Sequence, residues 1–179
     1  MTSTNRSDVG GRRLDDAAPT AGVDVVIEVP KGSRNKYEWD PKVGAMRLDR
    51  TLFTATRYPA DYGFIAGTLG EDGDPLDALV LLDEPAFPGC HVTCRPIGVF
   101  LMTDEHGPDA KLLMLPSADT RVEWRELEEV PASLLREIAH FFDIYKKLEP
   151  GKITTVHGWE GRAEAEAEVE RGLARAAAR

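Results

Sequence analysis

The sequence predicts a β-rich α+β domain, in which a small barrel of short strands comes first and helices follow. Three observations point to this class. Short segments with alternating or β-branched residues recur from Val23 to Pro116, turn clusters of Pro and Gly separate them, and helical periodicity begins only after Pro131. Many short strands with short connections are typical of small barrels, and we expect the late helices to cover the barrel.

The expected strands follow one another at short intervals. VDVVIEVP begins at Val23, and KYEWD and AMRLDR follow it, each separated by a turn cluster, so that two or three antiparallel strands are expected. Further strands are expected at residues 78–84 (ALVLLDE), 94–102 (CRPIGVFLM) and 111–116 (KLLMLP). The body of the protein is therefore expected to be β-rich, with many short connections.

Two helices are expected near the end of the chain. After Pro131 the apolar residues follow the 3.6-residue period, and Gly151 can close the helix; its stripe consists of Leu134, Leu135, Ile138, Phe141, Phe142, Tyr145 and Leu148. A final helix at about 161–178 is rich in Ala and Glu, with one narrow apolar face, and is expected to lie on the outside.

The chain is expected to form a single domain over residues 21–179, preceded by a flexible tail over residues 1–20. No internal repeat or long linker divides it, and the longest apolar run, Ala78 to Leu82, is far too short to cross a bilayer. The tail lacks the apolar segment of a secretory signal. We therefore expect a cytoplasmic protein without a membrane partner.

The two cysteines fit the same compartment. Cys90 and Cys94 lie in an expected strand, where four residues span about 13 Å, too far for a disulfide. His91 lies between them, but there is no second Cys or His pair at the spacing of a zinc site. Two reduced, half-buried thiols are expected.

The net charge is concentrated in one part of the chain. The sequence has 31 acidic and 22 basic residues, a formal balance of −9, and residues 61–110 contain ten acids and a single base, Arg95, while the rest is balanced. A chain of this charge is not a generic nucleic-acid binder, whose affinity depends on Lys and Arg. Because apolar residues interleave the acids, the acidic block belongs to a folded region and requires an explanation.

The sharpest local motif is Asp72-Gly-Asp74-Pro-Leu-Asp77, a Gly and Pro turn that leads into an expected buried strand. Taken alone it could be an ordinary surface turn, because Asp, Gly and Pro are the usual turn residues. Asp104 and Asp109 bracket a second Gly-Pro turn between two apolar strands. If the two turns converge, each close carboxylate pair costs about 4 kcal/mol at an effective dielectric near 20, so cations are needed.

Oxygen ligands favour hard cations, and Mg²⁺ or Mn²⁺ fits better than Zn²⁺. An EF-hand calcium loop does not fit: with Asp72 at position 1, Asp77 occupies position 6, where Gly is required, and Asp83 occupies position 12 in place of Glu. A carboxylate site with several metals suits phosphoryl chemistry, in which the ions lower the pKa of bound water.

Phosphoryl chemistry also needs positive charge and hydrogen-bond donors for the phosphate oxygens. The basic candidates could each be a surface charge or a simple ion pair, and the tyrosines could be packing residues. These candidates are Lys36, Arg50, Lys111, Lys146, Tyr58, Tyr62 and Tyr145. Lys36 and Glu38, like Asp109 and Lys111, are expected to share a strand face.

The motifs together resemble the soluble (family I) inorganic pyrophosphatases, bacterial type, whose signature D-G-D-P-x-D matches residues 72–77. The resemblance extends over about residues 21–175. In order, the matching segments are VIEVP (26–30), KYE (36–38), LDR (48–50), YP and YG (58–59 and 62–63), RPIGV (95–99), MTDE (102–105), DAK (109–111), HFF (140–142), YK (145–146), LE (148–149) and GW (158–159).

The resemblance implies a role for each matching residue. Mg²⁺ would be bound by Asp72, Asp77, Asp104 and Asp109. Glu28 and Glu38 would bind it directly or through water. Phosphate would be bound by Lys36, Arg50, Tyr62, Lys111, Tyr145 and Lys146, with Tyr58 as a pocket wall. Asp74 matches the usual general base, a role sometimes given to Asp109; we prefer Asp74, because a residue that serves two metals is a poor proton acceptor.

The implied reaction is hydrolysis of pyrophosphate to two orthophosphates by a water that Mg²⁺ activates. Mn²⁺ is an expected substitute, and Ca²⁺ is expected to bind but inhibit. The implied fold is a twisted five-stranded barrel, similar to oligonucleotide-binding barrels, with flanking C-terminal helices, and the implied assembly is a homohexamer. Two alternatives stay open: a non-catalytic binding module built on such a barrel, and a two-metal phosphodiesterase.

Two residues deserve separate expectations. Phe64 stands where many members of that family have Tyr, so one outer hydrogen bond is expected to be absent. His106 lies in the second acidic turn and could touch a metal or be exposed to solvent.

Overall fold

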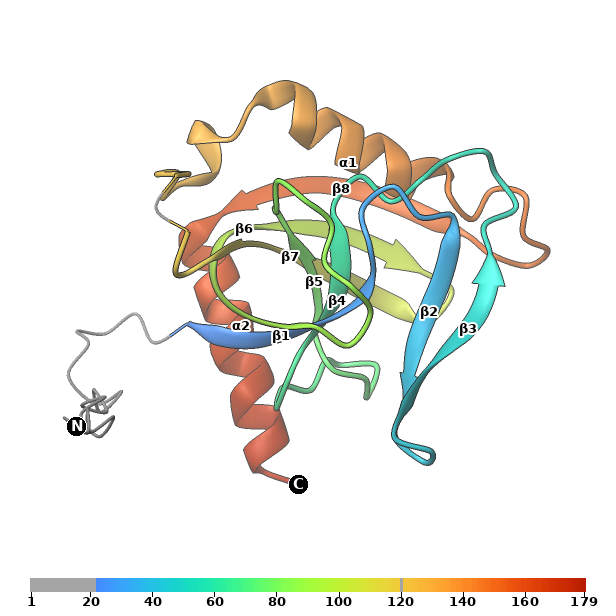
Figure 1. Cartoon of the computed structure of the whole chain (residues 1–179), viewed down its shortest axis with the longest axis horizontal. Coiled ribbons are helices and arrows are strands. Elements are labelled where there is room, and N and C mark those ends of the chain that lie inside the picture. The colour runs from blue at the N-terminus through green and yellow to red at the C-terminus, as the bar shows by residue number, and fades with distance from the viewer. Residues whose placement is uncertain (1–21, 120) are drawn as a thin grey trace, which may run out of the picture.

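A computed structural model describes residues 22–119 and 121–179 of the chain (Figure 1). The expected tail over residues 1–20 lies outside the described residues. Within them, no helix is both long enough and apolar enough to cross a membrane. Cys90 and Cys94 are free thiols, as expected, but only Cys90 is half-buried; Cys94 is fully buried, because it packs into an apolar cluster of the barrel.

Five strands form a closed ring. They run in the order β1 (Val23–Val29), β4 (Asp61–Ile65), β5 (Asp77–Val80), β7 (Gly107–Pro116) and β6 (His91–Asp104), and β6 pairs back to β1. The first residues of β6 close the ring, where Cys94 lies opposite Val23. All of these contacts are antiparallel except the one between β5 and β7. The expected small barrel is confirmed.

The long strand β6 belongs to two parts of the sheet. Its register shifts between Pro96 and Gly98, and beyond this point it pairs with β8 (Thr154–Gly161) instead of β1. The bulge follows from the sequence, because proline has no N–H group to donate to the ladder. Through the shift, the distal end of β6 extends beyond the ring and carries Asp104 to one end of the barrel.

Strands β2 (Asn35–Asp40) and β3 (Ala45–Thr51) form a separate two-stranded antiparallel ribbon. Figure 1 shows this ribbon standing beside the barrel, on the side away from α2. Its residues are half-buried or exposed throughout. The ribbon is therefore held by its turns and end contacts more than by a core of its own.

Two helices flank the barrel (Figure 1). Helix α1 (Ala132–Ile144) follows a short 3-10 turn, η2 (Leu127–Glu129), and packs along β8. It ends at Ile144, earlier than the expected end near Gly151, and Tyr145 to Pro150 form turns. Helix α2 (Arg162–Ala177) matches the expected final helix and contacts β6 and β8.

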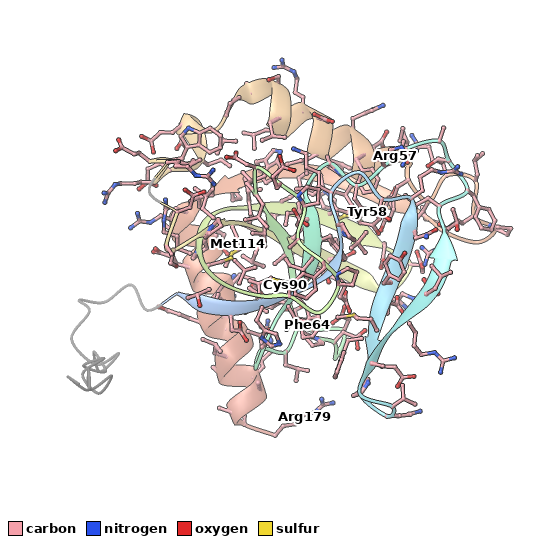
Figure 2. All side chains as sticks on the ribbon, viewed as in Figure 1. Arg57, Tyr58, Phe64, Cys90, Met114 and Arg179 are labelled. Carbon is pink, nitrogen blue, oxygen red and sulfur yellow. The ribbon has the colours of Figure 1, made fainter. Side chains whose placement is uncertain are left out.

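Two apolar clusters lie on opposite faces of the sheet, as alternate residues of β7 show. Leu113 and Leu115 join the cluster that α1 covers with Phe141 and Phe142. Leu112 and Met114 join the cluster that α2 completes with Ala165 and Val169. Met114, labelled in Figure 2, is fully buried. Each face of the barrel wall therefore carries one apolar cluster, and a different helix completes each cluster.

Sequence reasoning missed two strands and lengthened one. β4 and β8 each contain a glycine, which weakens a strand pattern. In β4 the glycine is required, because a Cβ at Gly63 would lie 1.9 Å from the carbonyl oxygen of Val26 on β1. β5 ends at Val80, so the expected strand over 78–84 is too long; residues 83–84 form a bend before Pro85.

Candidate active site

A cleft of about 870 Å³ opens between the barrel and the β2–β3 ribbon. The turns after α1 complete its wall. Every residue that the sequence singled out for metal binding, substrate binding or proton transfer lines this cleft: Glu28, Lys36, Glu38, Arg50, Tyr62, Asp72, Asp74, Asp77, Asp104, Asp109, Lys111, Tyr145 and Lys146. Residues that are up to 118 positions apart in the chain therefore meet in one place.

The floor of the cleft is an ion-pair cluster in which Lys111 is buried and Asp77 and Asp109 are half-buried. Asp77 on β5 lies directly beside Lys111 on β7 in the parallel register, and Asp109 lies two residues before Lys111 on the same strand face. The Lys111 ammonium contacts Asp77 and lies 2.5 Å from Oδ1 of Asp109. The sequence predicted that Asp109 and Lys111 share a face, but the pairing with Asp77 depends on the strand order.

Lys111 is held in an almost closed environment. Its side chain is only 3% exposed, its ammonium donates to the hydroxyl of Tyr62 at 3.4 Å, and the rings of Tyr62 and Phe142 lie 5.7 and 5.8 Å away. Burial alone lowers the pKa of Lys111, but the charges of Asp77 and Asp109 outweigh burial and hold that pKa above its ordinary value. Lys111 is therefore a permanent positive charge at the floor.

Glu28 is a buried carboxyl at the back of the cleft. Its Oε1 accepts the backbone N–H of Trp39 at 2.8 Å, so that β1 and the ribbon are joined at this point. Burial raises the pKa of Glu28 to about 7, against the opposing effect of the Trp39 N–H group. A carboxyl group in such a position is stabilised in its charged form by a nearby cation.

Asp72 and Asp74 lie on the loop between β4 and β5. Oδ1 of Asp72 accepts the backbone N–H of Asp74 at 3.1 Å, and Gly73 between them has φ +95°, a conformation that glycine adopts without strain. Both aspartates are exposed to the cleft. The motif therefore does form a Gly-containing turn, as expected for an ordinary surface turn. The same turn also presents two carboxylates to the cleft.

Another part of the cleft wall is formed by the end of β6 and the turns after α1. Asp104 accepts from Lys146 at 3.0 Å and from the backbone N–H of His106 at 2.8 Å. Burial alone would raise the pKa of Asp104, but these two contacts lower it below its ordinary value. Tyr145 is buried, which raises the pKa of its hydroxyl well above the ordinary range, so that it stays a hydrogen-bond donor.

The ribbon forms a more open rim. Lys36 pairs with Glu38 and lies 3.7 Å from Asp49, its neighbour across the ribbon. Arg50 pairs with Asp49 and, at 3.0 Å, with Glu149 in the turns after α1. The contact between Arg50 and Glu149 fixes the far end of the ribbon to the body of the protein.

Three further residues bear on the secondary expectations, and the missing hydrogen bond at Phe64 stays a prediction. Tyr58 (Figure 2) is buried against Tyr62 and Phe141, with ring centroids 5.3 and 4.8 Å away, so it forms the expected wall. Phe64 also lines the cleft. The side chain of His106 is 71% exposed and points its Nε2 to Glu105, 3.7 Å away, which fits the solvent-exposed alternative.

Several cleft residues were given no role by the sequence reasoning. Trp39 supplies the N–H group to Glu28, Asp49 and Glu149 hold Arg50, and Glu105 pairs with Lys152 across the entrance. Glu149 and Asp49 stand beside predicted site residues in the matching segments, so their position in the sequence could have identified them. Trp39 could not have been identified in this way, because it contributes a backbone N–H group and not its side chain.

The donor set of the cleft suits hard cations. Within residues 22–119 and 121–179, no three His, Cys, Asp or Glu side chains surround one point closely enough to count as an ion site. Asp77 and Asp109 instead face the Lys111 ammonium. The available ligands in the cleft are oxygen atoms of carboxylates, which are the donors that hard divalent cations prefer.

The fold and the cleft together define the class: a small closed barrel with an acidic, lysine-containing cleft suited to a phosphate-bearing anion. Comparison with known proteins is specific. The family model described as inorganic pyrophosphatase matches residues 25–177. An inorganic pyrophosphatase of Streptomyces coelicolor is 62% identical over 85% of this chain and 94% of its own length. One of Thermus thermophilus is 50% identical over 90% of this chain and 94% of its own length.

Solved structures agree with the sequence comparisons. The crystal structure of inorganic pyrophosphatase from Thermus thermophilus superposes with a TM-score of 0.86 at 48% identity, covering 93% of this chain and 97% of that one. The enzyme from Helicobacter pylori gives a TM-score of 0.85 at 40% identity, covering 93% and 99%. The chain belongs to the inorganic pyrophosphatase family, and it is an enzyme of that family.

Proposed function

We propose that this chain hydrolyses inorganic pyrophosphate to two orthophosphates with Mg²⁺ as its cofactor. The observation that carries the proposal is the convergence of six metal-ligand candidates and six substrate-binding candidates on one cleft. The cleft has the two features that a metal-dependent phosphoryl hydrolase needs: oxygen ligands for divalent cations, and positive charge for the remaining phosphate oxygens.

The residues that would hold Mg²⁺ are Asp72, Asp77 and Asp109, with Asp104, Glu28 and Glu38 as further ligands. Their oxygen donors and the raised pKa of Glu28 fit hard cations better than they fit soft ones. Bound Mg²⁺ would neutralise phosphate charge and lower the pKa of coordinated water. Mn²⁺ fits the same donors, whereas the larger Ca²⁺, with its looser geometry, is expected to bind and inhibit.

The substrate would be held by Lys36, Arg50, Tyr62, Lys111, Tyr145 and Lys146. Lys111 is a preformed charge at the floor beside Tyr62, and burial keeps the hydroxyls of Tyr62 and Tyr145 neutral. Lys36 and Arg50 stand on the ribbon, and Lys146 stands in the turns after α1, where it pairs with Asp104. Charge on a leaving phosphate can therefore be neutralised from three directions.

Asp74 is proposed to accept the proton of the attacking water. It is exposed to the cleft, whereas Asp109 already pairs with Lys111 and is assigned to a metal. Burial raises the pKa of Asp109, and Lys111 opposes that rise. A carboxylate with free oxygens accepts a proton more readily than one that is occupied by cations.

We further propose that the working protein is a cytoplasmic homo-oligomer, a hexamer by its family resemblance. Phe87 and Ile153, 69% and 66% exposed, are large apolar side chains that an interface would cover. Light scattering on the protein as it elutes from a size-exclusion column would measure the mass of the assembly. A monomer at micromolar concentration would contradict the proposed oligomer.

Phosphate release from three substrates tests the proposed activity. With Mg²⁺ present, pyrophosphate should be hydrolysed far faster than ATP or a dinucleotide. Preferential cleavage of the dinucleotide would favour a two-metal phosphodiesterase. Tight, salt-sensitive binding of RNA or DNA without phosphate release would favour a non-catalytic binding module, an interpretation that the net charge of −9 disfavours.

A further inference from the structure

The loop between β4 and β5, residues 66–76, is anchored to the barrel near its two ends, where the N–H of Ala66 donates to the carbonyl of Asp24 at 2.8 Å and Leu76 is buried in the core. Thr68 closes its base: the Thr68 hydroxyl donates to the carbonyl of Ile65 at 2.7 Å and accepts the N–H of Leu76 at 3.0 Å. Nearer the tip, the N–H of Gly70 donates to the carbonyl of Asp74 at 2.6 Å. These bonds hold the base of the loop and fold its tip on itself, so the position of the tip depends on further contacts.

Helix α2 supplies such contacts through Leu69. The N–H of Leu69 donates to the carbonyl oxygen of Gly172 at 3.0 Å. The carbonyl oxygen of Leu69 accepts Nε–H of Arg175 at 2.7 Å. Both backbone polar groups of one loop residue are therefore bound by the last turns of α2, three positions before the first aspartate of the motif.

Arg175 is itself held in place. Its Nη2 donates to Oε1 of Glu168 at 2.7 Å, and the other oxygen of Glu168 accepts from Arg171. Glu168 also lines a smaller pocket of about 240 Å³ together with Asp72, Asp77 and Asp109. The brace from Glu168 through Arg175 to Leu69 thus lies along a pocket that the proposed metal ligands share.

Gly172 allows the helix to come this close. A Cβ at Gly172 would lie 2.5 Å from Cδ1 of Leu76, 3.0 Å from its Cγ and 3.3 Å from Cβ of Thr68. Leu76 is buried and directly precedes Asp77. Any side chain at Gly172 would press on the segment that joins the loop to the floor of the cleft.

We propose that helix α2, through Arg175 and Gly172, positions the loop that carries Asp72 and Asp74 and thereby sets the affinity of the cleft for divalent cations. Both residues are positioning residues, because neither lines the main cleft. The inference rests on the proposed metal role of Asp72 and Asp77. Groups that orient metal ligands from outside commonly change metal affinity about 10- to 100-fold when they are removed.

Arg175→Ala in the full chain is the first test, with Arg171→Ala as the matched control. Arg171 pairs with the same Glu168 from the same helix but has no bond to the loop. Calorimetric titration with Mn²⁺ should show about tenfold weaker binding for Arg175→Ala, and the amide of Leu69 should exchange its hydrogen faster. Arg171→Ala should keep the affinity of the wild type, and Arg175→Lys should recover part of the loss.

Gly172→Ala tests the close approach of the helix to the loop. Crowding of the buried Leu76 outweighs the gain in helix propensity, so the thermal midpoint should fall and Mn²⁺ binding should weaken. Mn²⁺ binding measured well below the midpoint reports the position of the loop and not the stability of the fold. Unchanged Mn²⁺ affinity in both Arg175→Ala and Gly172→Ala would overturn the proposal.

Asp77→Asn keeps the failure of this inference distinct from the failure of the metal site. If Asp77→Asn binds Mn²⁺ more weakly than the wild type and Arg175→Ala does too, both hold. If Asp77→Asn is weakened but Arg175→Ala matches the wild type, the positioning role alone is wrong. If Asp77→Asn binds Mn²⁺ as tightly as the wild type, the metal assignment is wrong, and the positioning role is wrong with it.

Discussion

The floor and the rim of the cleft both pair a lysine with carboxylates, but the floor belongs to the closed barrel and the rim to the separate ribbon. The floor, Asp77, Asp109 and Lys111, stands on neighbouring strands of the closed barrel, where Lys111 is 3% exposed. The rim, Lys36 and Glu38, stands on a ribbon that belongs to a separate sheet, where Glu38 is 52% exposed. The same pairing of Lys with a carboxylate therefore has a different strength in the two places.

This difference indicates a division of labour. A buried ion pair leaves an uncompensated charge when one partner is removed, whereas an exposed pair contributes about 0–1 kcal/mol. The floor should control chemistry and stability together, and the rim should control substrate capture with little effect on stability. Each of the following changes tests one side of this division.

The largest effect is expected at the floor. Asp77→Asn or Asp109→Asn should lower the turnover of pyrophosphate at least ~100-fold, because each removes charge from ions that activate water. Steady-state phosphate release at saturating Mg²⁺ measures the change. Asp83→Asn, just beyond β5 and 63% exposed, is the control and should retain full activity. Near-normal turnover in both floor variants would remove the site assignment.

Lys111→Met should lower the free energy of unfolding by about 3 kcal/mol, since it leaves Asp77 and Asp109 facing each other without their shared cation. Denaturant unfolding with and without Mg²⁺ measures it, and Mg²⁺ should restore more stability to Lys111→Met than to the wild type. Lys147→Met, at an exposed pair on the surface, should change stability by less than about 0.5 kcal/mol. Equal losses in the two variants would contradict the contrast.

At the rim, Lys36→Ala should raise KM about tenfold, while kcat falls less and stability changes by less than about 0.5 kcal/mol. The expected loss is that of one charge-assisted hydrogen bond to phosphate. Lys42→Ala, in the exposed turn of the same ribbon, controls for general charge loss. A large loss of stability in Lys36→Ala would show that the rim contributes as much to the free energy of unfolding as the floor does.

The smallest effect concerns Asp61, a fully buried carboxyl on β4 that, among the described residues, forms no ion pair and so contrasts with the floor. Its Oδ1 accepts from the backbone N–H groups of Ala86 and Lys31, and, among the described residues, its Oδ2 is a buried atom without a hydrogen-bond partner. Burial raises the pKa of Asp61 above its ordinary 3.8, so the folded state favours the protonated form.

The stability that this proton provides is present at low pH and is lost as the pH rises from about 4 through the raised pKa. Asp61→Asn does not titrate, so its stability relative to the wild type should increase with pH over this range. Unfolding curves at several pH values measure the difference. A difference that is independent of pH would show that the Asp61 pKa is ordinary.

Much of the fold was predictable because its signals are local. The alternation in β1, the apolar run of β7 and the period of α1 each depend on neighbouring residues, and all three elements are present. β4 was missed because Gly63 hides the strand pattern, although the close approach of Val26 requires that glycine. The end of α1 was misplaced because the apolar period continues into turns.

The candidate site was predictable in its residues but not in its partners. The motif at residues 72–77 and the matching segments identified the lining side chains. The strand order that brings Asp77 beside Lys111, and the contact of Arg175 with the motif loop, join segments that are distant in sequence. No local pattern contains this information, because it arises from the closure of the barrel and the packing of α2.

A titration of phosphate release from pyrophosphate against Mg²⁺, with the wild type and Asp77→Asn side by side, tests the central claim most directly. The wild type should release two orthophosphates per pyrophosphate, with no turnover when Mg²⁺ is chelated, and Asp77→Asn should stay at least ~100-fold slower at every Mg²⁺ concentration. Turnover by the wild type that persists without divalent cations, or equal curves for the two proteins, would contradict it.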